Sequence, residues 1–87
     1  MHVILVYDVA EKRVGKMLRF VRRYLPHIQN SVFEGELPES KLAALKAGLT
    51  KRMEEDEDSV ILWIARDARW TQREILGTEK RPVTNFL

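Results

Sequence analysis

The chain has 87 residues, of which 45% are hydrophobic and 32% are charged, and its length is that of one small domain. It contains no cysteine, which excludes disulfide frameworks, thiolate metal sites and thiol nucleophiles. The 15 Lys and Arg exceed the 13 Asp and Glu only slightly, for a net charge of +2. Whether the chain binds nucleic acid must therefore be judged from how its charges are distributed.

The longest apolar runs, Val3–Tyr7 and Val60–Ala65, are too short to span a membrane, which takes about 20 apolar residues. The N-terminal region lacks the basic segment and the small-residue cleavage site of a secretory signal, so we expect a soluble cytoplasmic protein without a membrane partner. A domain of this size buries only about 60–65% of its unfolded surface. We therefore expect it to form an oligomer.

The first half of the chain predicts a strand, a helix and a second strand region. His2–Val9 reads HVILVYDV, which is typical of a strand buried on both faces. Apolar residues at helical spacing follow, at Val14, Met17, Leu18, Val21 and Leu25. Pro26 ends this helix. The alternating stretch Ile28–Leu37 predicts one long strand, or two short ones joined by a bend near Gly35.

The second half predicts another helix and another buried strand. Pro38 suits the first turn of a helix whose apolar face comprises Leu42, Leu45, Leu49 and Met53. We interpret the acidic run Glu54–Asp58 as a solvated loop and Ser59–Ala65 as the strand. Arg73–Leu76 is a candidate for a further short strand.

This element order favours an α+β fold of the ferredoxin-like, split βαβ type, with two helices on one face of a four-stranded antiparallel sheet. The other sheet face would be bare and apolar, which is typical of an association surface. Trp63 belongs to a strand and fits the core or a dimer interface better than base stacking. Trp70 lies in a polar stretch and is the better candidate for stacking on a base.

Asp8 is the candidate for chemistry, because the chain has no phosphate-binding glycine loop, no HExxH and no nucleophile elbow. A carboxylate at the end of a buried strand is well placed to bind a metal ion. The alternative is that Asp8 only closes the strand as a turn or helix-cap residue. One carboxylate is too few to bind Mg²⁺ firmly, and a two-fold dimer that pairs Asp8 with its own copy would supply the second.

A stripe of basic residues is the second clue. Six basic residues lie between Glu11 and Tyr24, and four of them share one helix face: Lys12, Lys16, Arg19 and Arg23. Like charges at this spacing repel each other, and an anionic partner such as nucleic acid would relieve that repulsion. The alternative is a merely solvated helix face. Further arginines at 66, 69, 73 and 81 could add phosphate contacts.

The residues as a set resemble the small CRISPR-associated adaptation protein family, the second of the two core Cas proteins. The resemblance rests on VILVYDV, on the Arg-rich helix and on QNSVFEGEL running into a helix after a proline. Gln29–Gly35 is its most specific part. SVILWIA and Ile75–Gly77 also match the family, and the match extends from Met1 to about Leu76.

The resemblance implies a homodimer whose sheets pack face to face, with a divalent metal, Mg²⁺ or Mn²⁺, held between two copies of Asp8. It implies nuclease activity on single-stranded RNA or on DNA, and the CRISPR integrase as a partner in spacer acquisition. Arg13 and the basic residues after it match the family's nucleic-acid side, and Tyr7, Ser31 and Phe33 match the border of the cleft. We expect a domain over residues 1–78 and a tail, 79–87, that pairs with the partner subunit.

Three functions remain open on these residues. The first is a dimeric, sequence-independent nucleic-acid binder with metal-dependent endonuclease activity and Asp8 as the catalytic ligand. The second is a DNA-binding scaffold of the integration complex in which Asp8 is only architectural. The third is a toxin-like ribonuclease of the same fold that acts outside CRISPR.

Overall fold

Four antiparallel strands form one sheet in the order β2–β3–β1–β4, as the computed structural model shows for residues 1–80. The central strand β1 (His2–Asp8) pairs with β3 (Val32–Glu36) on one side and with β4 (Ser59–Ala65) on the other. β2 (His27–Gln29) lies at the edge, beside β3. This is the predicted ferredoxin-like arrangement. The predicted partner-binding tail lies largely outside the described residues, which end at Lys80.

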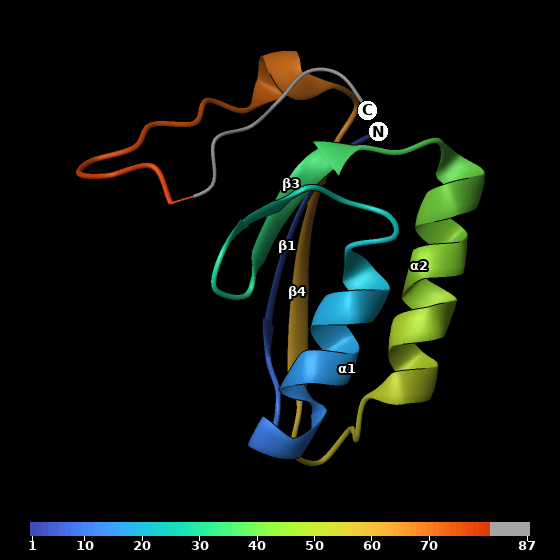
Figure 1. Cartoon of the computed structure of the whole chain (residues 1–87). Helices are drawn as coiled ribbons and strands as arrows, with labels where there is room; N and C mark the ends of the chain where they lie inside the picture. Colours follow the sequence, from blue (N-terminus) through green and yellow to red (C-terminus); the bar gives the residue numbers. More distant parts are fainter. Residues whose placement is uncertain (81–87) are drawn as a thin grey trace.

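Both helices, α1 (Glu11–Val21) and α2 (Glu39–Arg52), lie on the same side of the sheet (Figure 1). They cover the sheet face formed by Val3, Leu5 and Tyr7 of β1, and these three side chains are buried in the core. Within residues 1–80, neither helix combines the length and the apolarity needed to cross a membrane.

The buried face of α1 differs in part from the predicted one. Met17 and Val21 are buried as expected, and Phe20 joins them. Val14 is instead 41% exposed, in the first turns of the helix. The regular helix ends at Val21, before the proline, and a tighter turn continues to Leu25, whose N–H still bonds to the carbonyl of Val21.

The predicted bend at Gly35 is wrong, because the chain reverses at Asn30 and Gly35 lies inside β3. Asn30 has the positive φ of 42° that such a tight reversal needs, which asparagine tolerates better than most residues. Gly35 has another reason to be glycine. A Cβ there would lie 2.6 Å from Cδ of Pro26, so the glycine allows the α1–β2 connection to cross β3 closely.

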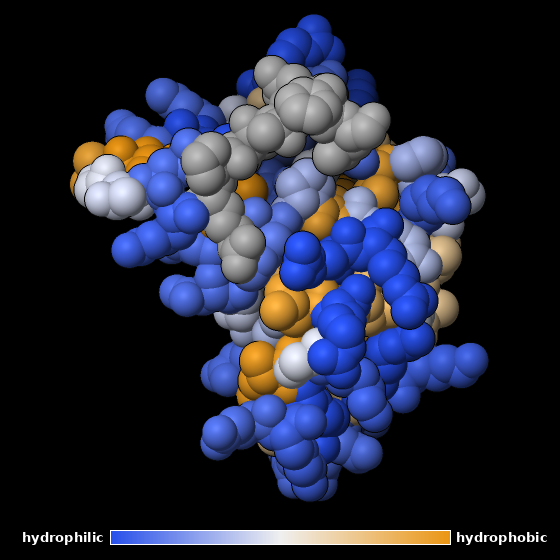
Figure 2. Space-filling model, in the orientation of Figure 1, coloured by the Kyte–Doolittle hydropathy of each residue, from blue (hydrophilic) through white to orange (hydrophobic). Residues whose placement is uncertain are grey.

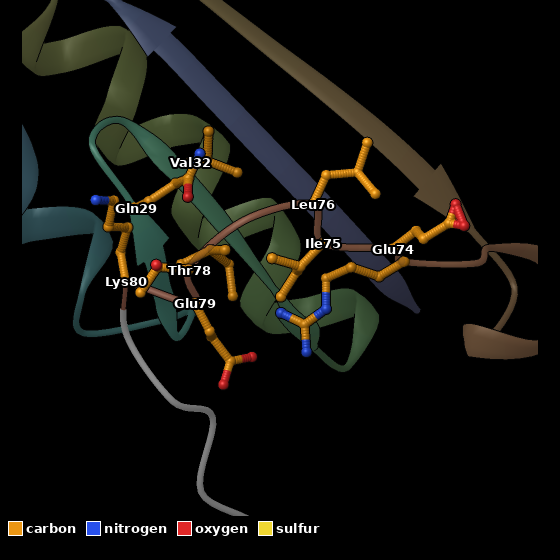
Figure 3. A pocket seen from close by; sticks show the side chains of 10 residues that line it. Gln29, Val32, Glu74, Ile75, Leu76, Thr78, Glu79 and Lys80 are labelled. Carbon is orange, nitrogen blue, oxygen red and sulfur yellow. The ribbon is translucent and has the colours of Figure 1, made fainter.

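Arg73–Leu76 forms no strand in the described chain, and the fourth strand is β2. Residues 73–80 instead lie against the β2–β3 hairpin, where they and Gln29 and Val32 border a pocket of about 260 Å³ (Figure 3).

The sheet face opposite the helices is open, as predicted from the topology. The prediction that the first strand is buried on both faces is therefore wrong for a single chain, because no helix covers the side of Ile4 and Val6, which are only partly buried. Beside them on β4, Ile61 is 49% and Trp63 is 53% exposed. The open face thus has an apolar centre.

Charged groups occupy the end of the open face where β1 begins. His2 is buried there between two carboxylates: Nε2 lies 2.8 Å from Glu34 and Nδ1 lies 3.2 Å from Glu36. Glu34 also lies 3.6 Å from Nε of Arg73, which attaches the segment after β4 to the sheet. This network lies at the far end of β1 from Asp8.

The two helices meet where Phe20 of α1 packs onto Gly48 of α2. A Cβ at Gly48 would lie 2.1 Å from Cζ of Phe20. The Phe20 ring has little room to move, because the Arg52 guanidinium lies 3.9 Å from its centroid and the Tyr24 ring lies 5.3 Å away. Gly15 on α1 differs, since a Cβ there would meet only the end of Arg19, at 3.4 Å.

We expect opposite effects from adding a methyl group at these two helical glycines. Gly48→Ala should lower the free energy of unfolding by about 1–2 kcal/mol, because overpacking outweighs the better helix propensity of alanine. Gly15→Ala should raise it by about 0.5–1 kcal/mol. Urea denaturation at one fixed protein concentration measures both. Two stabilised variants would contradict the close Phe20–Gly48 contact.

Candidate functional site

Asp8 is exposed at the end of β1, where it pairs in register with Ser59 of β4. Strand alternation places it on the same side as Ile4 and Val6, so it belongs to the open face. It borders a pocket of about 330 Å³, whose other lining residues are Tyr7, Val9, Val14, Asn30 and Ser31. The end of β1, the start of α1 and the β2–β3 turn therefore meet around this carboxylate.

Of the three residues expected to border the cleft, Tyr7 and Ser31 line this pocket with Asp8. The backbone N–H of Tyr7 donates to the carbonyl of Ser31, which connects the turn to β1. Burial raises the pKa of the Tyr7 hydroxyl, so this group stays protonated at neutral pH. The hydroxyl is therefore unsuited to accept a proton as a base.

Phe33, the third expected residue, does not border the pocket. Its side chain is completely buried on the helix side of the sheet. There it lies between two rings, with the Tyr7 centroid at 5.8 Å and the His27 centroid at 4.7 Å. Phe33 therefore supports Tyr7 from behind. His27 in turn holds the β2–β3 turn, because its Nε2 bonds to the carbonyl of Asn30 at 2.6 Å.

The pocket fits part of a metal site. Asp8 supplies one exposed carboxylate, and Mg²⁺ in proteins is commonly bound through one or two carboxylates with water in the remaining positions. Among residues 1–80, no three His, Asp or Glu side chains lie together as a metal-binding group. His2 cannot assist, because it lies six residue steps along the strand from Asp8, a distance of about 20 Å. A single chain therefore brings one carboxylate to this pocket.

Arg13 does not belong to the exposed basic surface. Its guanidinium bonds to the Asp58 carboxylate through Nε at 2.6 Å and through Nη2 at 2.9 Å, and it also reaches Glu57. Only 12% of the Arg13 side chain is exposed. The expectation that it binds nucleic acid is therefore corrected, because this side chain is engaged within the fold.

The acidic run is likewise not just a solvated loop. The Asp58 side chain is fully buried, and its carboxylate also accepts the backbone N–H groups of Ala10 and Glu54. The paired Arg13 guanidinium holds the pKa of Asp58 well below its usual range, and the two backbone donors lower it further. The same bonds raise the pKa of Arg13.

The predicted basic stripe is present and exposed. Lys12, Lys16 and Arg19 lie on α1 and Arg23 lies in the turn after it, all with exposed side chains. Hydrophilic side chains cover most of the surface on the side of the molecule seen in Figure 2. Two other arginines have acidic partners: Arg69 pairs with Asp67, and Arg73 lies near Glu34. Arg81 lies outside the described residues.

Sequence reasoning missed two pocket residues and one buried anchor. Asn30 follows directly after a short strand, and its tolerance of positive φ was a usable turn signal. Val14 was assigned to the core by its spacing, but it borders the pocket. Asp58 was hidden within a run of five acidic residues, where nothing in the pattern distinguished the buried one.

The chain matches known proteins over most of its length. The family model for CRISPR associated protein Cas2 matches residues 1–73. The chain belongs to this family. A protein of Dictyoglomus turgidum named CRISPR-associated endoribonuclease Cas2 is 49% identical over 80 residues, which are 92% of each chain. One of the same name from Methanocaldococcus jannaschii is 44% identical over all of this chain and 76% of its own.

The fold agrees with a solved Cas2 structure as well. A Cas2 crystal structure superposes with a TM-score of 0.86 and 38% identity, over 100% of this chain and 98% of the other. The resemblance found in the sequence is thus confirmed at the level of family and fold. For a Cas2 family member, the pocket beside Asp8 and the stripe on α1 are the two features that need a functional explanation.

We expect the Arg13–Asp58 pair to make the stability of this chain depend on pH in acid. Because the Asp58 pKa is lowered on folding, the pair stabilises fully above about pH 4, the ordinary value for aspartate, and this contribution is lost as the pH falls further. Asp58→Asn should therefore unfold at lower urea concentration than wild type at pH 7, with a difference that shrinks toward pH 3. A difference that stays constant over this range would contradict the assignment.

Proposed function

We propose that this chain is a metal-dependent endonuclease of CRISPR adaptation that acts as a homodimer on single-stranded RNA, with DNA as a second substrate class. The observation that carries the proposal is the exposed Asp8 carboxylate in a pocket that Tyr7 and the polar turn residues Asn30 and Ser31 also line. The names of the relatives favour RNA, since they are called endoribonucleases.

The open sheet face supports a dimer. Ile61 and Trp63 are about half exposed on it, and a second copy of the same face would remove both from water. Asp8 belongs to that face, so a two-fold axis near the end of β1 would bring two Asp8 carboxylates to one site. Each chain would then complete the half-site of the other.

The paired carboxylates would hold Mg²⁺ or Mn²⁺. When bound, such an ion neutralises phosphate charge and activates water for attack on the phosphodiester. Asp8 would position the ion at the end of β1, and the Ser31 side chain would orient the phosphate by a hydrogen bond.

The exposed stripe of Lys12, Lys16, Arg19 and Arg23 would contact the phosphate backbone. Because contacts to phosphates carry no sequence information, the chain would bind nucleic acid without sequence preference. The stripe begins in the first turn of α1, only four residues after Asp8, which would connect binding to the site of cleavage.

A non-catalytic scaffold that acts with the CRISPR integrase is the second candidate. The observation that favours it is that a single chain supplies one carboxylate, whereas the basic stripe is complete without Asp8. Membership of the Cas2 family favours either of these roles over a toxin-like ribonuclease outside CRISPR. Loss of cleavage separates the enzyme from the scaffold.

Asp8→Asn should reduce Mg²⁺-dependent cleavage of single-stranded RNA to the level of a buffer control. It should leave RNA affinity unchanged, because the basic stripe is intact. Sedimentation at micromolar concentration should give the mass of two chains for both proteins, since the substitution removes like charges that would face each other. Equal cleavage by wild type and variant, purified identically, would support the scaffold. A one-chain mass would contradict the dimer.

Reversing the charge of Arg19 and Arg23 to Glu should weaken RNA binding much more than reversing Lys46 and Lys51 on α2. Each lost phosphate contact should lower the log–log salt slope by about 0.7 for a single strand, so two lost contacts should lower it by about 1.4. Fluorescence anisotropy at a series of salt concentrations measures both quantities. Equal effects of the two double variants would indicate diffuse charge rather than a defined path for the strand.

A further inference from the structure

We propose that Asp58, held by Arg13, is a positioning residue for Asp8. The inference rests on the proposed function, in which Asp8 binds the metal ion. Asp58 does not border the Asp8 pocket, and its buried carboxylate cannot reach a substrate. Its effect would come through the backbone that presents Asp8.

The Asp58 carboxylate has a complete set of donors. Oδ1 accepts the backbone N–H of Ala10 at 2.9 Å and Nη2 of Arg13 at 2.9 Å. Oδ2 accepts the backbone N–H of Glu54 at 2.8 Å and Nε of Arg13 at 2.6 Å. A carboxylate has about four acceptor positions, so each is used. Such a buried, fully bonded ion pair has one preferred geometry and resists displacement.

These bonds fix the chain on both sides of the site. Asp8 is paired with Ser59 in the β1–β4 ladder, and Asp58 immediately precedes Ser59. Ala10, two residues after Asp8, is bound directly to the Asp58 carboxylate. The Asp8 backbone is therefore held between two attachments to one short segment of the chain, Asp58–Ser59.

The same carboxylate substitutes for a missing helix cap. Ala10 is the N-cap residue of α1, and its side chain makes no capping bond. The negative charge of Asp58 lies at the positive end of the α1 dipole, and Arg13 in the first turns of α1 is bound to it. Without Asp58, both Val9 and the first turn of α1 would be less constrained. Val14, the residue directly after Arg13 in α1, borders the pocket and would be affected as well.

This arrangement matters because a metal ligand must be placed within a fraction of an ångström. Misplacement of a catalytic group by about 1 Å can cost about 100-fold in rate, even when the substitution lies outside the site. A positioning role therefore predicts a loss in metal binding and in kcat, with little change in KM for RNA, which depends on the basic stripe.

The test compares Asp58→Asn with Gly48→Ala in the full-length dimer. Asp58→Asn keeps the shape of the side chain but replaces one acceptor oxygen by an NH₂ group, which cannot accept hydrogen bonds from Arg13 or from the backbone N–H groups. Gly48→Ala destabilises the fold where the two helices meet, at a residue that does not border the Asp8 pocket. Three quantities are measured where both variants are folded by circular dichroism: amide hydrogen exchange at Asp8 and Val9, Mn²⁺ affinity by calorimetry, and kcat and KM for single-stranded RNA.

We expect Asp58→Asn to speed exchange at Asp8 and Val9 by about 10-fold or more, beyond any change at core amides. Mn²⁺ affinity and kcat should each fall by about 10–100-fold, the size of effect seen when groups that orient metal ligands are removed, with KM nearly unchanged. Gly48→Ala should leave Mn²⁺ affinity, kcat and KM unchanged, and any faster exchange at Asp8 and Val9 should not exceed the change at core amides. If Asp58→Asn does not fold, Arg13→Lys is the second variant. It keeps the positive charge but loses the bidentate contact with the Asp58 carboxylate, and it should show the same pattern to a smaller extent.

The inference is overturned if Asp58→Asn matches Gly48→Ala in exchange at Asp8 and Val9, or if its losses appear in KM alone. Failure of the proposed function looks different. In that case wild type and Asp8→Asn bind Mn²⁺ equally and neither cleaves RNA, while the exchange measurement still decides whether Asp58 holds the end of β1.

Discussion

One buried carboxylate joins the two chain reversals at the end of the sheet where Asp8 lies. Asp58 belongs to the connection between α2 and β4. Of the groups it binds, Ala10 belongs to the connection between β1 and α1, and Arg13 belongs to the first turn of α1. Burying an ion pair is costly unless every lone pair and donor is satisfied, and here the guanidinium and two backbone N–H groups satisfy it. The pocket, the first turn of α1 and the start of the basic stripe are all placed relative to this contact.

The other constraint is the asymmetry of the sheet. The helices enclose one face, with Val3, Leu5 and Phe33 fully buried beneath them, while Ile61 and Trp63 remain about half exposed on the other. The open face is charged where His2 lies between Glu34 and Glu36 and again at Asp8. An apolar centre with polar ends is the usual composition of a protein–protein interface. The stability of one chain and the assembly of two would therefore depend on the same four strands.

The two helices, the ferredoxin-like fold class and the open face could be predicted because they follow from hydrophobic periodicity and from the order of the elements along the chain. The errors lie where a distant contact decides the outcome. A glycine at position 35 favours a bend in the sequence pattern. In the structure a glycine is needed there because the Pro26 ring lies too close for a Cβ. Arg13 fits a basic stripe by its position, but its side chain is bound by residues 44 and 45 positions away. Asp8 could be found because it ends an apolar strand. Asn30 carried a local turn signal, but the sequence does not show that this turn lies beside Asp8.

The central position of β1 has a consequence for the order in which the site can form during synthesis. The first strand to leave the ribosome ends with Asp8, yet its longest pairing is with β4, the last strand of the sheet. Contacts that close so long a loop tend to form late in folding. The α1 and β2–β3 regions can gain structure first, but Asp8 gains its ladder partner only when Ser59 arrives. A nascent or truncated chain that stops before residues 58 and 59 would leave Asp8 without its ladder partner, so the arrangement around this carboxylate would form only with the completed sheet.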